Sequence, residues 1–280
     1  MILSHKQVVP PLKAHQEGRR VVATSLDLGI SKVEIVIESD HAVLAPGITL
    51  SPDIIDEIAR DRNACFLVEK GRGRKTQRFS EHTNLFYSLF PTDSAATLMI
   101  SGIPMHRIKD ANPWLDSQSK VEALGRISGQ VLDTCTGLGY TAVLAATRPA
   151  SVTTVELDPV VLELARFNPW SKDLFVNPRI RQIVGSIVEE IDDFGNDKFS
   201  YTIHDPPMVG LAGDLYSGDF YRELHRVLRP KGRLFHYTGD PQSKLGRSTA
   251  RGVARRLRAA GFSAVKSREE AFGLVAFKTA

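Results

Sequence analysis

The sequence predicts an α/β fold with a mostly parallel sheet, preceded by a small β-rich N-terminal domain. Residues 20–104 contain short segments of alternating apolar side chains, which are typical of strands. From about Pro113 onward, apolar strands alternate with longer helical segments, as in a sheet with crossover helices. Residues 131–140 run from an apolar strand through a turn with two glycines into a helix. We therefore expect domains at 1–112 and 113–280.

The composition is that of a globular protein. The chain has 280 residues, 42% hydrophobic and 24% charged, with a formal net charge of +4, which excludes a disordered or coiled-coil chain. Cys65 and Cys135 lie in unrelated contexts, so we expect neither a disulfide framework nor a metal site. No apolar run approaches the roughly 18 residues that span a bilayer, and residues 1–20 lack the apolar core of a signal peptide. We expect a soluble cytoplasmic protein without a membrane partner. Whether the protein forms a homo-oligomer stays open.

The first domain is expected to consist mainly of strands. Residues 32–38 alternate cleanly, with Val33, Ile35 and Ile37 on one face. Ser51 provides an N-cap before Pro52, which indicates a short amphipathic helix from that point. The other expected elements are strands at 21–28, 42–44, 65–68 and 97–100 and a turn at 46–47.

In the second domain, strands and helices alternate along the chain. Strands are expected at 130–133, 151–157, 179–184, 199–204 and 233–237, and helices at 140–147, 159–166, 219–228 and 247–260. Residues 262–266 and 274–278 should close the sheet as a final pair, with an antiparallel last strand. A linker at 109–126 with a short helix precedes this domain.

The turn with two glycines is the strongest sign of a ligand site. Gly137 and Gly139 allow backbone N–H groups to approach a ligand closely. Asp133 ends the strand just before the turn, where a carboxylate is poorly suited to a pyrophosphate and well suited to a cationic ligand. The alternative is an ordinary strand–turn–helix in which this aspartate is a cap.

A second acidic side chain ends the next strand. Glu156 lies 23 residues beyond Asp133, where a carboxylate can accept hydrogen bonds from both ribose hydroxyls of a nucleoside. The structural alternative is a helix cap, but Asp158, before Pro159, fits that role better. We therefore assign Glu156 to the ligand and Asp158 mainly to the cap.

The fourth strand ends in a turn that suits a substrate amine. Asp205 is followed by Pro206 and Pro207, which stiffen the turn. Ligands of open α/β sheets lie outside the carboxyl ends of the strands, so this turn can accept hydrogen bonds from an amine and aim its lone pair. The alternative is a proline-stiffened loop. His204 is a candidate general base because imidazole titrates near neutrality, although a local hydrogen bond is the plainer role.

These motifs resemble class I methyltransferases that depend on S-adenosyl-L-methionine (SAM). The resemblance covers roughly residues 113–280 and rests on 133–139, Glu156, the 205–207 turn and the closing pair at 262–278. It implies a Rossmann-like class I methyltransferase sheet with SAM as the cofactor. It further implies methyl transfer to an acceptor, for which a nitrogen in RNA is the first choice and a small molecule the other.

The whole chain also resembles a group of predicted methyltransferases with no settled substrate. This second resemblance rests on residues 101–107, 168–171 and 211–217. Two departures from the wider family concern the acceptor and the adenine: Met208 stands where N-methylating members commonly have an aromatic residue, and Gly185-Ser186 stands where the family often has Gly-Asp.

The expected site residues fall into three groups. Donor contacts are expected from Asp133, Thr134, Gly137, Gly139, Tyr140, Glu156, Leu157, Gly185, Ser186 and Asp205. The expected catalytic residues are His204, Asp205, Pro206 and Pro207, and acceptor contacts are expected from Met208, Tyr216, His106 and Arg107.

Two other functions stay open. An aminopropyltransferase resembling spermidine synthases would use decarboxylated SAM and a polyamine, and it would need several acidic side chains, for which Asp205, Asp214 and Asp219 are candidates. A scaffold with this fold could instead bind RNA without catalysis. The basic residues 69–78 suit RNA phosphates, but a solvated hairpin tip explains them as well.

Overall fold

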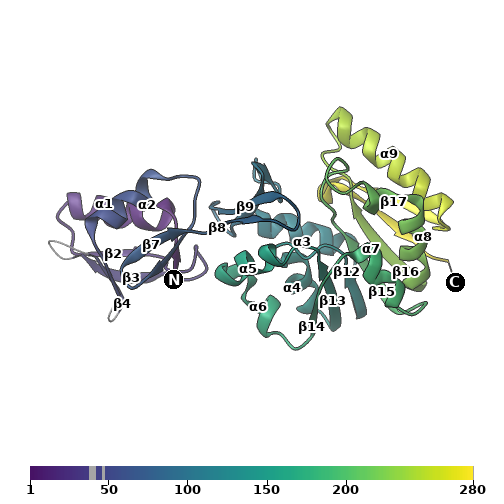
Figure 1. Cartoon of the computed structure of the whole chain (residues 1–280), viewed down its shortest axis with the longest axis horizontal. Helices are drawn as coiled ribbons and strands as arrows, with labels where there is room; N and C mark the ends of the chain where they lie inside the picture. The colour runs from purple at the N-terminus through teal and green to yellow at the C-terminus, as the bar shows by residue number, and fades with distance from the viewer. Residues whose placement is uncertain (38–41, 46–47, 280) are drawn as a thin grey trace. The chain divides into compact units, whose positions relative to one another are not determined.

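The computed structural model describes residues 1–37, 42–45 and 48–279, which form two compact units (Figure 1). The first unit contains Met1–Trp114 and Val160–Lys172, and the second contains Leu115–Pro159 and the chain from Asp173 onward. The expected turn at 46–47 lies outside the described residues. The domain boundary at 112/113 stays a prediction. Within the described ranges, no helix has the length and apolar character needed to cross a membrane.

The N-terminal part is β-rich, as expected. Its elements are β1 (Ile2–Leu3), α1 (His5–Gln16), β2 (Val21–Thr24), β3 (Val33–Ile37), β4 (Ala42–Ala45), β5 (Ile48–Leu50), α2 (Pro52–Arg60), β6 (Phe66–Glu69), β7 (Arg72–Lys75), β8 (Gln77–Ser80), β9 (Leu85–Phe90), β10 (Thr97–Ile100) and β11 (Ile103–Pro104). They form antiparallel sheets with the strand orders β1-β6-β7, β2-β3-β4-β5 and β11-β10-β9-β8. The basic segment is the β6–β7 hairpin, whose tip residues Lys70 and Gly71 have φ angles of 49° and 70°.

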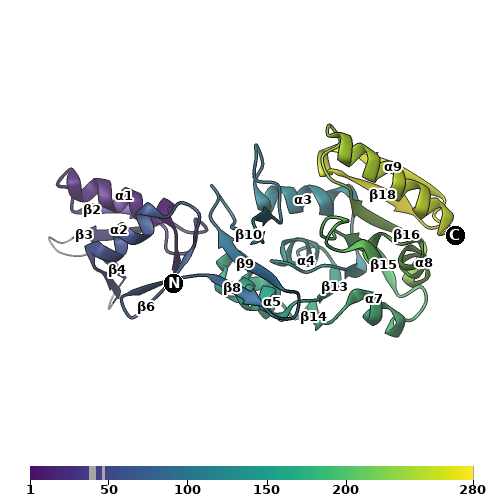
Figure 2. The same ribbon diagram turned by 45° about the horizontal axis from the view of Figure 1, so that its top comes forward.

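Helix α1 is the main element that the sequence analysis missed, and it lies beside α2 (Figure 2). It begins with a capping box, in which Ser4 accepts a hydrogen bond from Lys6 N–H and Gln7 Oε1 accepts one from Ser4 N–H. Pro11 cannot donate to the carbonyl of Gln7 because proline has no N–H. The hydroxyl of Thr24 donates to that carbonyl at 2.6 Å instead, so the helix tolerates the proline.

The second unit is built around a seven-stranded sheet. The elements after residue 112 are α3 (Pro113–Ala123), β12 (Gly129–Asp133), α4 (Tyr140–Ala146), β13 (Ala150–Glu156), α5 (Pro159–Phe167), η1 (Pro169–Ser171), α6 (Lys172–Val176), β14 (Ile180–Val184), α7 (Ile187–Glu190), η2 (Ile191–Asp193), β15 (Phe199–His204), η3 (Gly213–Tyr216), α8 (Gly218–Val227), β16 (Leu228–Tyr237), α9 (Lys244–Ala259), β17 (Ala264–Arg268), η4 (Glu269–Ala271) and β18 (Gly273–Phe277). The strand order is β14-β13-β12-β15-β16-β18-β17. The first five strands are parallel and the last pairings are antiparallel, which confirms the predicted fold class.

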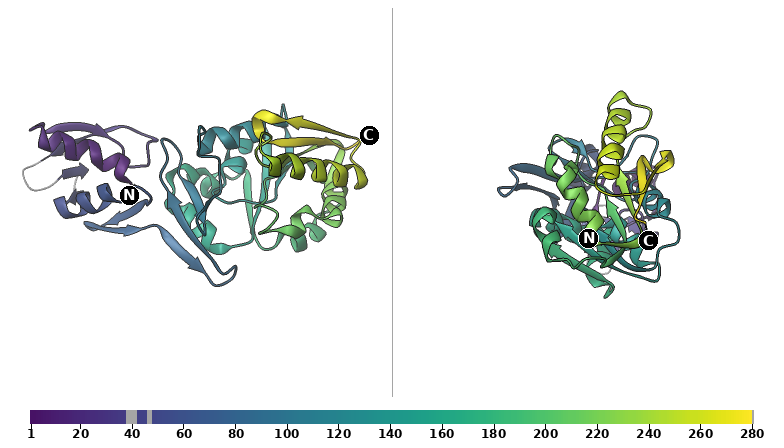
Figure 3. Two further views of the ribbon diagram at one scale, coloured as in Figure 1. Left: turned by 90° about the horizontal axis from the view of Figure 1, so that it is seen from above. Right: turned by 90° about the vertical axis from the view of Figure 1, so that its right-hand side faces the viewer.

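Helices cover both faces of this sheet (Figure 1). Side chains alternate between the faces along each strand. Leu132 packs in an apolar core with residues of α7, α8 and α9, whereas its neighbour Asp133 points to the face of α4. Figure 3 shows α9 beside the closing pair β17–β18, which agrees with the contacts between these elements.

Strand β16 begins earlier than the sequence analysis predicted. The expected start was residue 233, after a helix at 219–228, and Pro230 lies between them. The structure instead starts the strand at Leu228, which pairs with Phe199, and the register then jumps so that Tyr201 pairs with Arg233. The proline is accommodated at this irregularity because it donates no ladder hydrogen bond.

The strand order brings three carboxyl ends together. Strand β12 lies between β13 and β15. After β12 the chain adds β13 and β14 on one side, and it then crosses back to add β15 and β16 on the other side. In such sheets, ligands bind outside the carboxyl ends at this reversal. The residues that end these strands therefore define the candidate site.

Candidate active site at the carboxyl ends of the strands

Acidic side chains follow three neighbouring strands. Asp133 is the last residue of β12 and Glu156 the last residue of β13, as predicted, while Asp205 directly follows β15. Asp133 pairs in register with Thr154 of β13 and Ile203 of β15. The negative charges of Asp205 and Glu156 add to burial in raising the pKa of Asp133.

Asp133 lies beneath the glycine turn, with no exposed surface. Its Oδ2 accepts a hydrogen bond from Thr154 Oγ1 at 2.8 Å, and its Oδ1 accepts one from Thr141 Oγ1 at 3.2 Å. Burial raises the pKa of Asp133 to about 8, although the threonine hydroxyls oppose this shift. This position suits a role in setting the charge and shape of the turn from below.

Replacing Asp133 should make stability less sensitive to pH. A carboxyl group whose pKa rises from 3.8 in the unfolded chain to about 8 in the fold costs stability as pH rises between these values. Asp133→Asn removes this cost and keeps an oxygen for a threonine hydroxyl. We expect its melting temperature to exceed that of the wild type by about 3 °C or more at pH 9 and by little near pH 3.8, as measured by scanning calorimetry. A gain equal at both pH values would contradict the assignment.

Glu156 binds the turn from the neighbouring strand. Its Oε2 accepts a hydrogen bond from Gly137 N–H at 2.7 Å, and its Oε1 accepts one from Asp158 N–H at 3.1 Å. Burial raises the pKa of Glu156 to about 7, against these backbone donors. Unlike Asp133, Glu156 is half-buried, and its predicted contact with a ligand stays a prediction.

Gly139 is required by the shape of the turn. Its φ is 77°, and a Cβ there would lie 2.6 Å from Leu174 Cδ2. Gly139→Ala should therefore lower the free energy of unfolding by about 2 kcal/mol, since both the left-handed backbone and the contact are unfavourable. Gly195→Ala is the control, because its Cβ meets nothing within 4 Å and its φ is not in this region. Equal urea midpoints for the two variants would refute this expectation.

His204 is enclosed by hydrogen bonds at both ring nitrogens. Its Nδ1 lies 2.7 Å from Thr134 Oγ1, and its Nε2 lies 3.0 Å from the carbonyl oxygen of Leu215. The carbonyl can only accept, so Nε2 carries the proton and Nδ1 accepts from the threonine. Burial lowers the pKa of His204 to about 3. The surroundings favour a neutral imidazole that ties the glycine turn to the 213–216 segment over a base that contacts substrate.

His236, at the end of β16, has a similar environment. Its ring centroid lies 4.5 Å from that of His204 in an edge-to-face arrangement. Its Nε2 lies 2.7 Å from Tyr221 Oη, and its Nδ1 lies 2.6 Å from the carbonyl oxygen of Tyr237. Burial lowers the pKa of His236 well below its usual value. Burial therefore keeps both His204 and His236 neutral.

Asp205 is paired with a lysine that the sequence analysis did not select. Lys120 Nζ, on α3, lies 2.6 Å from Asp205 Oδ2 and 2.9 Å from Asp116 Oδ2. The signal in the sequence is weak: Asp116 and Lys120 have the spacing of a helical ion pair, and Lys120 stands next to the buried Val121. Since Lys120 and Asp205 are 85 residues apart, only the fold brings them together.

The remaining predicted site residues lie in three settings. Tyr140, Thr134 and Tyr216 are buried, and the hydroxyl of Tyr216 donates to the carbonyl of Pro207 at 3.0 Å. Burial raises the pKa of Tyr216. The exposed members, near the ends of the strands, include Leu157, Pro207 and Met208. The half-buried or buried ones include Gly185, whose N–H donates to the carbonyl of Glu156, as well as Ser186 and Pro206.

His106 and Arg107 belong to the first unit. His106 Nδ1 lies 2.9 Å from Thr97 Oγ1, and the ring is buried. This hydrogen bond gives His106 a structural partner within its own unit, and its predicted acceptor contact stays a prediction, as does that of Arg107.

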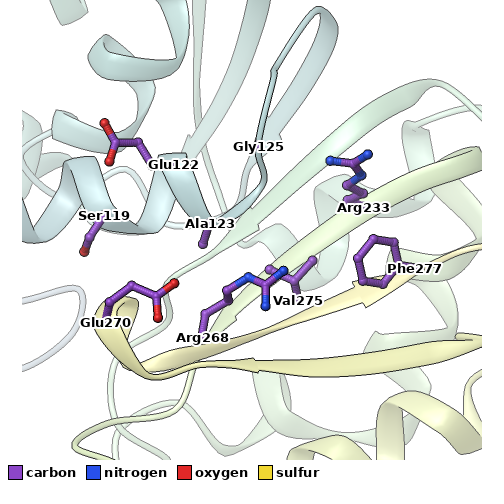
Figure 4. Close-up of a pocket in the computed structure, with 9 residues that line it drawn as sticks. All are labelled: Ser119, Glu122, Ala123, Gly125, Arg233, Arg268, Glu270, Val275 and Phe277. Atoms are coloured by element: carbon purple, nitrogen blue, oxygen red, sulfur yellow. The ribbon is translucent and has the colours of Figure 1, made fainter.

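A cavity of about 310 Å³ lies elsewhere in the second unit (Figure 4). It is bounded by α3 and by strands β16 and β18, with Arg233, Arg268 and Phe277 among the residues that line it. Arg233 donates to the carbonyl of Leu124, at the end of α3. None of the predicted site residues lines this cavity, so we place the candidate site at the strand ends.

The chain is similar in sequence to proteins of two kinds. The uncharacterized protein MJ1233 of Methanocaldococcus jannaschii is 43% identical over 260 residues, which cover 90% of this chain and 88% of that protein. A polyamine aminopropyltransferase of Sulfolobus acidocaldarius is 30% identical over 99 residues, which cover 34% of this chain and 32% of that protein. No protein-family model matches the chain.

The fold is shared with solved structures. A spermidine synthase in complex with the transition state analogue AdoDATO superposes with a TM-score of 0.59 and 18% sequence identity, covering 80% of this chain and 84% of that one. At this level of identity the likeness concerns the fold. It shows that the chain has the Rossmann-like fold predicted from the sequence, without distinguishing a methyltransferase from an aminopropyltransferase.

Proposed function

The chain belongs to the family of the M. jannaschii protein MJ1233, and we propose that it is an aminopropyltransferase that uses decarboxylated SAM and an amine acceptor. This was the alternative in the sequence analysis. One observation supports it above the others: Asp133, Glu156 and Asp205 gather at adjacent strand ends. Burial, together with the negative charges of Asp205 and Glu156, raises the pKa of Asp133, so a cationic donor would favour the ionised form of this carboxyl group.

The charge of the donor decides between the two candidate donors. SAM carries a sulfonium, an ammonium and a carboxylate, whereas decarboxylated SAM carries only the two positive groups. A site in which carboxyl groups gather attracts the donor with two positive charges more strongly and disfavours an added carboxylate. The site also suits a nucleoside. Glu156 is half-buried, and its carboxylate oxygens can accept hydrogen bonds from the ribose hydroxyls.

Each residue then has a defined role. Glu156 accepts hydrogen bonds from the ribose, and Asp133 supports the turn from beneath and ionises when a cationic donor binds. When bound, the sulfonium donor supplies an electrophilic carbon and a neutral thioether leaving group. Asp205 accepts a hydrogen bond from the acceptor amine and directs its lone pair toward that carbon, while Pro206 and Pro207 hold the turn in place. After the new C–N bond forms, the amine loses a proton to Asp205 or solvent.

The comparisons support this choice of reaction. The matched segment in Sulfolobus acidocaldarius belongs to a polyamine aminopropyltransferase. That name describes the other protein and agrees with the charge argument for this chain. The agreement of two independent arguments makes aminopropyl transfer the first function to test.

Product analysis tests the proposal directly. The full chain is incubated with decarboxylated SAM or SAM and a set of amines, and the nucleoside products are separated by chromatography. Aminopropyl transfer yields methylthioadenosine from decarboxylated SAM, whereas methyl transfer yields S-adenosylhomocysteine from SAM. We expect methylthioadenosine that appears only when an amine is present. Turnover of SAM alone would overturn the proposal, and binding of neither donor would favour a non-catalytic scaffold.

Methyl transfer from SAM is the second candidate. The observation that favours it is the Asp205-Pro206-Pro207 turn, through which the sequence resembles methyltransferases. In this case the acceptor is a nitrogen, in RNA or in a small molecule, next to the exposed Met208. Adding RNA to the assay with SAM distinguishes this candidate, because aminopropyl transfer does not consume SAM.

A further inference from the structure

The closing strands bring cationic side chains to one face of the sheet. Val275 of β18 pairs in register with Lys266 of β17. Phe277 lies on the same face of β18 as Val275 and pairs with Arg233 of β16. Arg268 follows Lys266 by two residues, so its side chain is also on this face. Three cations and two apolar side chains therefore share one side of the closing strands.

Two of these cations, together with both apolar side chains, line the cavity of about 310 Å³ beside α3 (Figure 4). Helix α3 bounds the other side of the cavity through Ala123. Val275 is buried, and Phe277, Arg233 and Arg268 are half-buried. A cavity of this volume is at the lower end of the range for small-molecule sites, which combine apolar walls with a few polar groups.

Arg233 is held in one orientation by its neighbours. Its Nη1 donates a hydrogen bond to the carbonyl of Leu124 at 2.8 Å. Gly125 comes next in the chain, with a φ of 77°, and a Cβ there would lie only 3.0 Å from Nη1 of Arg233. The guanidinium carbon also lies 5.8 Å from the ring centroid of Phe277. A guanidinium that is already fixed loses less conformational freedom when a ligand binds.

The two guanidinium groups have backbone partners and no carboxylate partner. Arg268 Nη1 donates to the carbonyl of Ser267 at 3.0 Å. Within the ranges that the structure describes, neither Arg233 nor Arg268 forms an ion pair. Glu122 and Glu270 also line the cavity, but both are exposed, where water and salt screen their charges. The half-buried wall of the cavity therefore presents positive charge to a ligand.

We propose that this cavity binds a small organic anion, with its carboxylate or phosphate group at Arg233 and Arg268 and its apolar body against Val275 and Phe277. A guanidinium donates paired hydrogen bonds to either kind of anionic group. Lys266, 5.5 Å from the ring centroid of Phe277, adds a third positive charge on the same face. The site goes beyond the reaction proposed at the strand ends and does not depend on it.

Probes that share one ring and differ in their polar group test the ligand class. Phenylacetate carries a carboxylate, phenyl phosphate carries a phosphate, and 2-phenylethanol is uncharged. Each probe is titrated into the full chain, labelled with ¹⁵N, at pH 7.5. The amide signals in NMR spectra locate the bound probe, and their concentration dependence gives the Kd.

The variants remove one cation at a time. Arg268→Met deletes a guanidinium whose hydrogen bond goes to the carbonyl of its own neighbour in the chain, so the strand pairing is kept. Arg233→Met deletes the other guanidinium. Arg255→Met is the control, because Arg255 is an exposed residue of α9, which packs against the opposite face of the sheet.

At least one of the two anions should shift the amide signals of Ala123 and Val275 and leave that of Gly137 in place. We expect 2-phenylethanol to bind about tenfold more weakly than this anion or worse, and each cavity variant to weaken the anion by about tenfold. Arg255→Met should bind like the wild type. The anion with the lower Kd identifies the preferred group, carboxylate or phosphate.

Three results would overturn the inference: equal affinity for the alcohol and both anions, signal shifts confined to other parts of the chain, or an anion affinity of Arg268→Met within about twofold of wild type. If Arg233→Met does not fold, Arg268→Met decides the question. Ala123→Leu narrows the cavity without changing its charge and should also weaken the anion by about tenfold. Unchanged binding in that variant would place the anion on the open surface and refute the cavity as its site.

Discussion

Asp205→Asn should lower kcat with decarboxylated SAM and an amine by about 100-fold or more, which is the range of a lost proton acceptor. The substitution keeps the size of the side chain and an oxygen that can accept from Lys120, but it removes the negative charge that directs the acceptor amine. The affinity for decarboxylated SAM should also fall, because Asp205 contributes to the negative field at the strand ends, although Glu156 and the glycine turn still hold the nucleoside. Rapid-quench measurement of methylthioadenosine formation separates the chemical step from binding.

The matched control for this variant is Asp193→Asn. Asp193 is exposed in η2, so its substitution should leave the rate unchanged. If Asp205→Asn kept more than half of the wild-type rate at saturating acceptor, Asp205 would not be the group that directs the amine. The turn would then be structural, as the proline-stiffened loop considered in the sequence analysis.

The second large effect is expected on donor binding. Glu156→Ala removes a carboxylate that can accept two charge-assisted hydrogen bonds from ribose hydroxyls, and we expect the Kd for decarboxylated SAM to rise by about 100-fold. The variant also frees the N–H groups of Gly137 and Asp158, so thermal unfolding is measured alongside binding. Glu189→Ala, an exposed residue of α7, is the control. Equal affinity of Glu156→Ala and the wild type would contradict the donor assignment.

Much of the sheet could be predicted because its signals are local. The strands that end at Asp133, Glu156 and His204 are rich in β-forming residues and are followed within four residues by a glycine or a proline, and each of them ends at or next to the expected residue. Helix α1 was missed because Pro10 and Pro11 argue against a helix. Its capping box, formed by Ser4 and Gln7, was the signal that could have revealed it.

The surroundings of the site residues could not be predicted, because they depend on contacts between distant parts of the chain. His204 has the same neighbours in sequence whether it is exposed or buried, and only the fold shows that both ring nitrogens are engaged. Lys120 is a typical surface residue by composition, and its burial against Asp205 follows from the placement of α3 on the sheet. The strand ends could therefore be located from the sequence. The burial of His204 and the ion pair between Lys120 and Asp205 could be found only in the three-dimensional structure.

The central claim is that acidic strand ends bind a nucleoside with two positive charges, and calorimetric titration of the full chain tests it most directly. The ligands are decarboxylated SAM, SAM and uncharged methylthioadenosine, each titrated at pH 6 and pH 8.5. Because the pKa values of Glu156 and Asp133 are about 7 and 8, both carboxyl groups ionise across this range and a cation binds with proton release. The account predicts that decarboxylated SAM binds most tightly and that its lead over methylthioadenosine grows with pH. Tighter binding of SAM, or an affinity for methylthioadenosine equal to that for decarboxylated SAM at pH 8.5, would contradict it.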